Sequence, residues 1–138
     1  MKNTSHIKNQ MQDLKLFGML QTLEASLTEA SQGDSSPSDL LAELLQAESD
    51  WRHEKLIKSR IQGAKLKGKP TLEDFDFTVK RSITKTQVKE LYKLGWLNRG
   101  RAMLITGPTG VGKTFLSQAL GHHACHHKHT VLFMTFSD

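Results

Sequence analysis

Apolar residues in the first third of the chain recur at the spacing of an amphipathic helix. They lie three or four positions apart, at Ile7, Met11, Leu14, Phe17, Leu20, Leu23 and Leu27. This periodicity predicts one helix with a single apolar face. A break rich in Gly, Ser and Asp follows, and Ser36 and Pro37 suit the N-cap and first residue of a second helix over residues 37–64. We expect residues 1–66 to form a small α-helical N-terminal domain.

The apolar pattern changes in the last third of the chain. Residues 103–106 read Met-Leu-Ile-Thr, a helical pattern covers residues 115–126, and residues 130–136 are rich in β-branched and aromatic side chains. A strand, a helix and a strand in this order predict a right-handed parallel βαβ unit. We therefore expect an α/β domain over residues 102–138.

Residues 67–101 are expected to connect the two domains. Segment 71–77 combines acidic residues with Phe75 and Phe77, and we expect an irregular linker whose two rings dock onto the α/β domain. Thr84 and Gln87 have the spacing of a capping box, which predicts a short helix over residues 85–94.

The turn between the first predicted strand and its helix contains the most specific functional motif of the sequence. It has the pattern G-x-x-x-x-G-K-T, formed by Gly107, Pro108, Thr109, Gly110, Val111, Gly112, Lys113 and Thr114. The glycines allow a tight turn whose N–H groups, with the helix N-terminus, face a polyphosphate. Lys113 is placed to reach the β and γ phosphates, and the Thr114 hydroxyl to ligate Mg²⁺. The fold class predicted is therefore an α/β P-loop NTPase, in which we assign no catalytic residue.

The net charge of +5 is unevenly distributed along the chain. Residues 1–50 hold three Lys and eight acids, whereas residues 51–69 hold seven basic residues and one acid. Such a cluster suits the phosphates of DNA, and its members are Arg52, Lys55, Lys58, Arg60, Lys65, Lys67 and Lys69. A second basic cluster consists of Lys80, Arg81, Lys85, Lys89, Lys93, Arg99 and Arg101. A solvated face of basic side chains explains the same pattern equally well.

The composition also bears on the cellular compartment. No stretch approaches the roughly 20 apolar residues of a membrane span, and the N-terminus lacks the apolar run of a signal peptide. We expect a cytoplasmic protein with no membrane association. Cys125 is the only cysteine, which excludes an intrachain disulfide, and we expect it to be a small buried hydrophobe.

Two histidine pairs lie at i, i+4 spacing, His122 with His126 and His123 with His127. Such a pair on one helical face can chelate Zn²⁺ or Ni²⁺. No further carboxylate or thiolate is well placed in the sequence, which favours a polar helix end over a metal site.

Several segments together resemble one family, the IstB-like transposition helper ATPases of the AAA+ superfamily, which are relatives of the DnaC-type helicase loaders. The matching segments are 16–19, 44–48 with Arg52, 64–66, 71–77, 107–114 and 119–125. The resemblance implies an ATP-bound oligomer on DNA that recruits and regulates a transposase, with Lys113 and Thr114 binding the phosphates and Mg²⁺.

The sequence also departs from that family. Its members continue through a strand ending in acidic residues, a sensor residue and an arginine finger, and none of these follows residue 138. An arginine finger alone is worth about 10³ to 10⁵ in rate. We therefore expect a C-terminally truncated member that binds nucleotide without hydrolysing it.

Two alternative functions stay open from the sequence. One is a replicative helicase loader of the DnaC type, which the genomic neighbourhood would distinguish. The other is a non-enzymatic interaction module, in which residues 1–64 bind a partner or DNA and the phosphate loop is vestigial.

Overall fold

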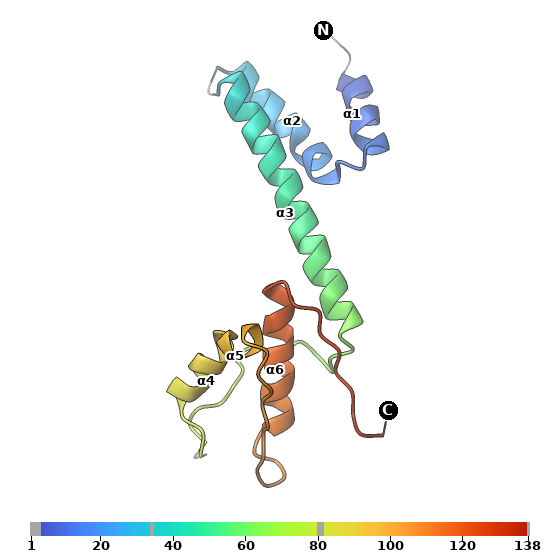
Figure 1. Cartoon of the computed structure of the whole chain (residues 1–138). Coiled ribbons are helices and arrows are strands. Elements are labelled where there is room, and N and C mark those ends of the chain that lie inside the picture. The colour runs from blue at the N-terminus through green and yellow to red at the C-terminus, as the bar shows by residue number, and fades with distance from the viewer. Residues whose placement is uncertain (1–3, 34, 80–81, 138) are drawn as a thin grey trace. The chain divides into compact units, whose positions relative to one another are not determined.

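The computed structural model of the protein describes residues 4–33, 35–79 and 82–137. These residues contain six α-helices and no β-strand (Figure 1). The helices are α1 (Thr4–Asp13), α2 (Phe17–Ser31), α3 (Pro37–Gly63), α4 (Lys85–Tyr92), α5 (Gly95–Asn98) and α6 (Lys113–His126). The chain divides into two compact units, residues 1–56 and 57–138, and the division falls within α3, before the boundary expected at residue 66.

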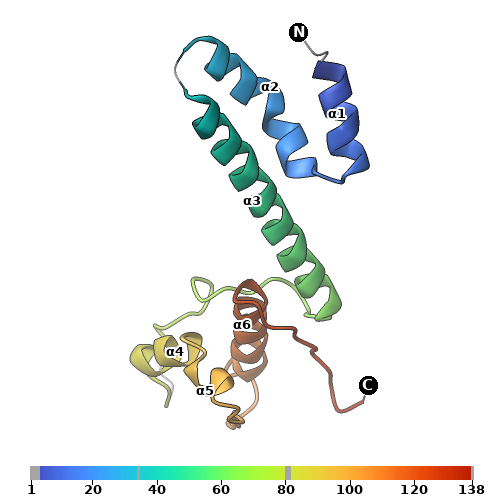
Figure 2. The same ribbon diagram turned by 45° about the horizontal axis from the view of Figure 1, so that its top comes forward.

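The N-terminal unit is built from α1, α2 and the first part of α3, as Figure 2 shows. Met11, Leu23 and Leu44 form its buried core, one residue from each helix. Ser36 caps α3 as predicted, because its Oγ accepts a hydrogen bond from the Asp39 N–H and the Asp39 carboxylate accepts one from the Ser36 N–H. The predicted bounds of α3 are confirmed to within one residue.

The prediction of one continuous helix over residues 7–27 is wrong, because the chain breaks between α1 and α2. Lys15 adopts a left-handed backbone conformation with φ of 58°, and the Leu16 N–H turns back to the Met11 carbonyl. Leu14, which belongs to the apolar repeat, is 68% exposed as a result. The break lets the N-terminus of α2 pack against α3. Helical periodicity in the sequence does not predict this tertiary contact.

The contact between α2 and α3 leaves no room for a side chain at Gly18. A Cβ atom added there would lie 2.4 Å from the Ala47 carbonyl oxygen and 2.6 Å from the Glu48 Cα. The Glu48 carboxylate uses this close approach to accept hydrogen bonds from the N–H groups of Gly18 and Met19, at 2.7 and 3.2 Å. It therefore caps the N-terminus of α2, where the N-cap residue Leu16 offers no side-chain hydrogen bond.

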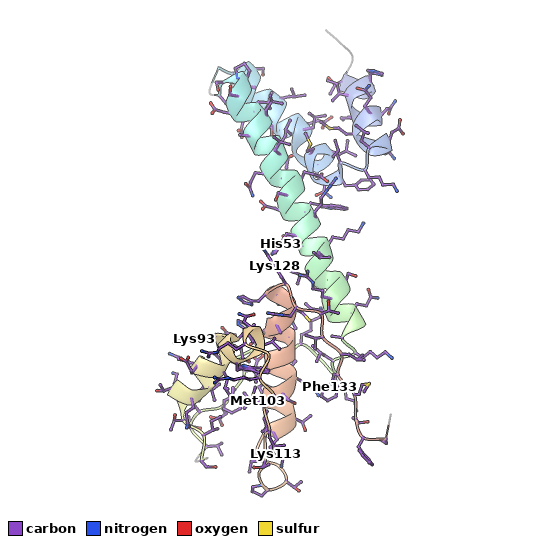
Figure 3. All side chains as sticks on the ribbon, viewed as in Figure 1. His53, Lys93, Met103, Lys113, Lys128 and Phe133 are labelled. Atoms are coloured by element: carbon purple, nitrogen blue, oxygen red, sulfur yellow. The ribbon has the colours of Figure 1, made fainter. Side chains whose placement is uncertain are left out.

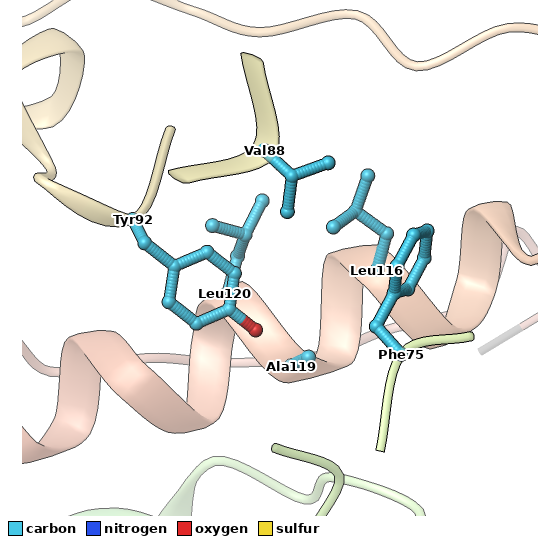
Figure 4. Close-up of a cluster of buried hydrophobic side chains, with 6 residues drawn as sticks. All are labelled: Phe75, Val88, Tyr92, Leu116, Ala119 and Leu120. Carbon is cyan, nitrogen blue, oxygen red and sulfur yellow. The ribbon is translucent and has the colours of Figure 1, made fainter. Parts of the chain in front are cut away.

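The C-terminal unit is organised around α6. Val88 and Tyr92 of α4 point at Leu116, Ala119 and Leu120 of α6, and Phe75 closes one end of this cluster (Figure 4). Phe77 packs against the same cluster, so the predicted docking of both linker rings is confirmed.

The short helix α4 also follows the sequence prediction. Thr84 and Gln87 form the predicted capping box, and α4 ends at Tyr92, two residues before the expected end. The four-residue α5, which follows a left-handed Leu94, was not anticipated.

The predicted βαβ unit does not form in the described residues. Segments 103–106 and 130–135 do show the side-chain alternation of strands, since Met103 and Ile105 are half-buried while Leu104 is 88% exposed. Their backbones, however, form no ladder with each other among the described residues, and the Phe133 N–H instead donates a hydrogen bond to the Ala64 carbonyl. A strand exists only with a hydrogen-bonded neighbour, and within the described chain neither segment has one.

Replacing Gly18 with Ala should destabilise the N-terminal unit by about 1–3 kcal/mol, because the atoms in the way belong to the α3 backbone and cannot rotate aside. Chemical unfolding followed by circular dichroism measures the change. Gly63→Ala is the matched control, since nothing lies within 4 Å of a Cβ at that position. Equal stability of the two variants would refute the close approach.

The charge of Glu48 should make the N-terminal unit sensitive to acid. Burial raises the pKa of this carboxyl, but hydrogen bonds from Arg52, Met19 and Gly18 outweigh burial and leave the pKa lowered. Its stabilisation is therefore present above the usual glutamate range and is lost as the pH falls through the lowered pKa.

We expect Glu48→Gln to cost about 1.5–3 kcal/mol at neutral pH, and the gap to the wild type to close in acid, where the wild-type carboxyl is protonated too. Unfolding free energies measured across the acidic range test this. Glu43→Gln removes an exposed carboxylate from the same helix and should leave the pH profile unchanged.

Candidate nucleotide-binding site

The loop before α6 takes the backbone conformations that its glycines predict. Gly110 and Gly112 have φ values of 80° and 94°, in the left-handed region that favours glycine. Gly112 is also the N-cap of α6, so it offers no side chain to cap the helix. Lys113 and Thr114 are the first two residues of α6 and therefore follow the glycine turn directly.

The Lys113 side chain folds back over the loop. Its Nζ donates hydrogen bonds to the carbonyl oxygens of Gly107 and Pro108, both at 2.6 Å. Figure 3 shows Lys113 at the loop end of α6. The ammonium thus sits beside the glycine turn, where an anion bound by the helix N-terminus would meet it.

A cavity of about 900 Å³ adjoins the loop. Gly107, Pro108, Val111, Gly112 and Lys113 line one part of it, while Gln87, Glu90 and Leu91 of α4 line another. A volume of this size accommodates a ligand as large as a nucleotide. Sequence motifs did not reveal the α4 residues, whose only signal was their i, i+3 and i+4 spacing on one helix.

The residues of the loop fit Mg²⁺ bound together with a phosphate ligand. Thr114 is exposed beside Lys113, and its hydroxyl is the hard oxygen ligand that Mg²⁺ prefers. Pro108 and Thr109 are exposed at the turn of the loop. When bound, Mg²⁺ would neutralise phosphate charge next to Thr114.

The seven basic residues predicted to contact DNA lie in different environments. Arg52 pairs with Glu48 at 2.7 Å, and the Lys55 ammonium lies over the Trp51 ring at 4.8 Å. The Arg60 side chain turns inward, since its Nη1 is buried and finds no hydrogen-bond partner among the described residues. The remaining four cations are exposed, and they are Lys58, Lys65, Lys67 and Lys69.

Lys67 and Lys69 are brought together at one cavity. Its volume is about 500 Å³, and Phe115 and Gln118 of α6 line its other side. In the second basic cluster, Lys93 pairs with Glu90, whereas Lys80 and Arg81 lie outside the described residues.

The histidines at the end of α6 pack as a polar helix end. The His122 and His126 rings are 4.9 Å apart, and the His123 Nε2 hydrogen bonds with the Tyr92 carbonyl at 2.9 Å. Burial lowers the pKa of both His122 and His123, with the neighbouring histidines adding to the effect. Among the described residues, no three His, Cys, Asp or Glu side chains are arranged so that they could hold a metal ion.

Burial shifts the pKa of two further groups, one on α4 and one on α6. Cys125 is fully buried, and burial raises the pKa of its thiol, as expected of a small hydrophobe. Burial also raises the pKa of Tyr92 to about 12, with the Glu73 charge contributing.

No helix in the described residues is long and apolar enough to cross a membrane.

Comparison with known proteins places these features in one family. The family model described as IstB-like ATP-binding protein matches residues 9–138. A relative from Mycobacterium tuberculosis is 37% identical over 84% of this chain and 46% of its own length. A relative from Pseudomonas fluorescens is 35% identical over 95% of this chain and 57% of its own length.

A relative from Pseudomonas aeruginosa is 37% identical over 88% of this chain and 46% of its own length. The names of these relatives provisionally describe them as ATP-binding proteins of insertion sequences, IS1162 and IS21 for the two Pseudomonas proteins. The chain spans about half the length of these curated relatives. Since the family model covers nearly the whole sequence, the chain belongs to the IstB-like ATP-binding proteins.

Proposed function

We propose that this chain is an ATP-binding helper of DNA transposition that acts with a transposase on DNA. The observation that carries the proposal is the glycine turn at Gly110 and Gly112, which opens onto α6 with no side-chain cap and beside a nucleotide-sized cavity. The relatives named for insertion sequences favour this role over helicase loading.

In this proposal the triphosphate lies against the loop and the N-terminus of α6, and the nucleoside extends toward α4. Lys113 exchanges its two carbonyl acceptors, Gly107 and Pro108, for phosphate oxygens. This exchange is favourable because a charged phosphate is a stronger acceptor than a neutral carbonyl. Thr114 supplies the hydroxyl for Mg²⁺. Negligible hydrolysis by the chain alone stays a prediction.

The proposed DNA contact is electrostatic and independent of base sequence. Lys58, Lys65, Lys67 and Lys69 are exposed cations of the first basic cluster, and cations that neutralise DNA phosphates release condensed counterions. Arg52, Lys55 and Arg60 contribute less in this proposal, because each is engaged by the protein or turned inward. Transposase contact and assembly into an oligomer are part of the same proposal and follow from the family.

Lys113→Ala should weaken binding of Mg-ATP by about tenfold or more, because a charge-assisted contact to phosphate is lost. Calorimetric titration of the full chain measures the affinity. Lys128→Ala removes an exposed cation beyond the opposite end of α6 and should bind as the wild type does. Equal affinity of all three proteins would indicate a vestigial loop and favour the interaction module.

Binding to DNA of unrelated sequences should weaken with salt, and the double variant Lys67→Ala/Lys69→Ala should reduce the slope of log K against log salt by about two. Fluorescence anisotropy over a salt series measures that slope. Lys8→Ala/Lys15→Ala removes the same charge from the acidic part of the sequence and should leave the slope unchanged. A slope that both pairs change equally would assign the effect to net charge alone.

A further inference from the structure

The cavity at Lys67 and Lys69 is a separate site on the same helix as the phosphate loop. Residues 67–70 line one side of it, and Phe115 and Gln118 of α6 line the other. None of these residues lines the larger cavity beside the loop. The volume of about 500 Å³ is enough for one nucleotide unit.

The amide of Gln118 is a buried polar group that the described residues leave unsatisfied. Gln118 is 6% exposed, and within the described chain its side chain forms no hydrogen bond. An amide offers two N–H donors and an acceptor oxygen, and buried polar groups are nearly always paired. Because the residue lines the cavity, a ligand that carries both donors and acceptors would satisfy the amide there.

Phe115 supplies an aromatic surface on the same face of α6, three residues before Gln118. Its ring packs near Phe75, with 6.0 Å between the ring centroids, and it is half-buried against the apolar cluster of the C-terminal unit. The residue also lines the cavity. A ring fixed in this way is a platform on which a flat aromatic group can stack.

The opposite side of the cavity is cationic. Lys67 and Lys69 are exposed, no acidic side chain lines the cavity, and neither lysine forms an ion pair within the described chain. Gly68 between them has a φ of 96°, in the left-handed region, and nothing lies within 4 Å of a Cβ added there. A ligand can therefore approach the backbone between two unpaired positive charges.

We infer that this cavity holds one unpaired nucleotide of DNA, so that the chain binds single-stranded DNA more tightly than duplex DNA. The base stacks on Phe115, the Gln118 amide hydrogen bonds with the edge of the base, and Lys67 and Lys69 contact the adjoining phosphates. A nucleotide is anionic, flat and rich in donors and acceptors, so one ligand satisfies all three parts of the cavity. A base in duplex DNA is stacked and paired, and it offers neither its face nor its pairing edge.

The inference rests on the proposed DNA contact of Lys67 and Lys69 and adds an interaction with the base. Charge alone would favour the duplex, because duplex DNA releases more counterions for each neutralised phosphate than a single strand does. A preference for the single strand therefore has to come from stacking and hydrogen bonding. Since an amide both donates and accepts, the site tolerates any of the four bases.

Fluorescence anisotropy with the full chain tests the preference, using an oligonucleotide of about 12 nucleotides as a single strand and as a duplex at one salt concentration. The wild type should bind the single strand about tenfold more tightly than the duplex. Photo-crosslinking of a strand that contains 5-iodouracil, followed by mass spectrometry, identifies the residue that the base contacts. We expect the cross-link at Phe115.

Two substitutions separate the base contact from the charge contact. Gln118→Leu replaces the amide with an apolar side chain of similar size, and Phe115→Leu removes the stacking surface. Each should weaken binding of the single strand by about fivefold to tenfold and leave binding of the duplex unchanged. Gln62→Leu makes the same chemical change at an exposed position of α3 and should bind both DNAs as the wild type does. Circular dichroism checks that each variant keeps its helices.

The outcomes distinguish this inference from the proposed function. Equal binding of single strand and duplex, with salt dependence retained, would overturn the base contact and leave the electrostatic contact standing. Loss of binding to both forms of DNA in the wild type would remove both proposals. A cross-link that maps away from Phe115, as expected if a protein segment fills the cavity instead, would also overturn the inference. So would a Gln118→Leu effect that is equal for the two DNAs.

Discussion

The N-terminus of α6 is the constraint on which the candidate site depends. Helices α2, α3 and α4 each have their first N–H groups satisfied by a side chain, namely Glu48, Ser36 and Thr84. Helix α6 begins at a glycine in the left-handed conformation and has no side-chain cap. Its positive dipole end is therefore directed into the loop, where an anion gains most from it. Side chains meet this need in α2, α3 and α4, whereas α6, like the four-residue α5, has no side-chain cap.

An uncapped helix N-terminus can hold an anion in a fixed position only if the helix itself is held in place. Leu116, Ala119 and Leu120 fix α6 through the apolar cluster with α4, and Phe75 adds a contact from the linker. His123 reinforces the pair at the other end, through its hydrogen bond with the Tyr92 carbonyl and its ring contact with Tyr92 at 4.7 Å. The loop thus extends from a helix that is packed along its length within the C-terminal unit, and this helix positions Lys113.

The sequence predicted the features that depend only on residues close together in the chain. The caps at Ser36 and Thr84 and the left-handed glycines of the loop each depend on residues within a few positions, and all were found where expected. Tertiary contacts decided the rest. The break after α1 accompanies the close approach of α2 to α3 at Gly18, and the Arg60 Nη1 is buried rather than exposed to solvent. Charge clustering alone had placed Arg60 with the exposed cations.

At the two predicted strands, the side-chain pattern of a strand is present although no hydrogen-bonded strand forms. Side chains alternate between half-buried and exposed along 103–106 and 130–135, as they do in a strand with one covered face. Apolar residues at nearly every position predict cover on both faces, as in a buried parallel strand. The described chain covers one face only and supplies no ladder. One neighbouring helix is enough to bury a side chain, whereas a strand also needs a second backbone beside it, and the described residues supply none for either segment.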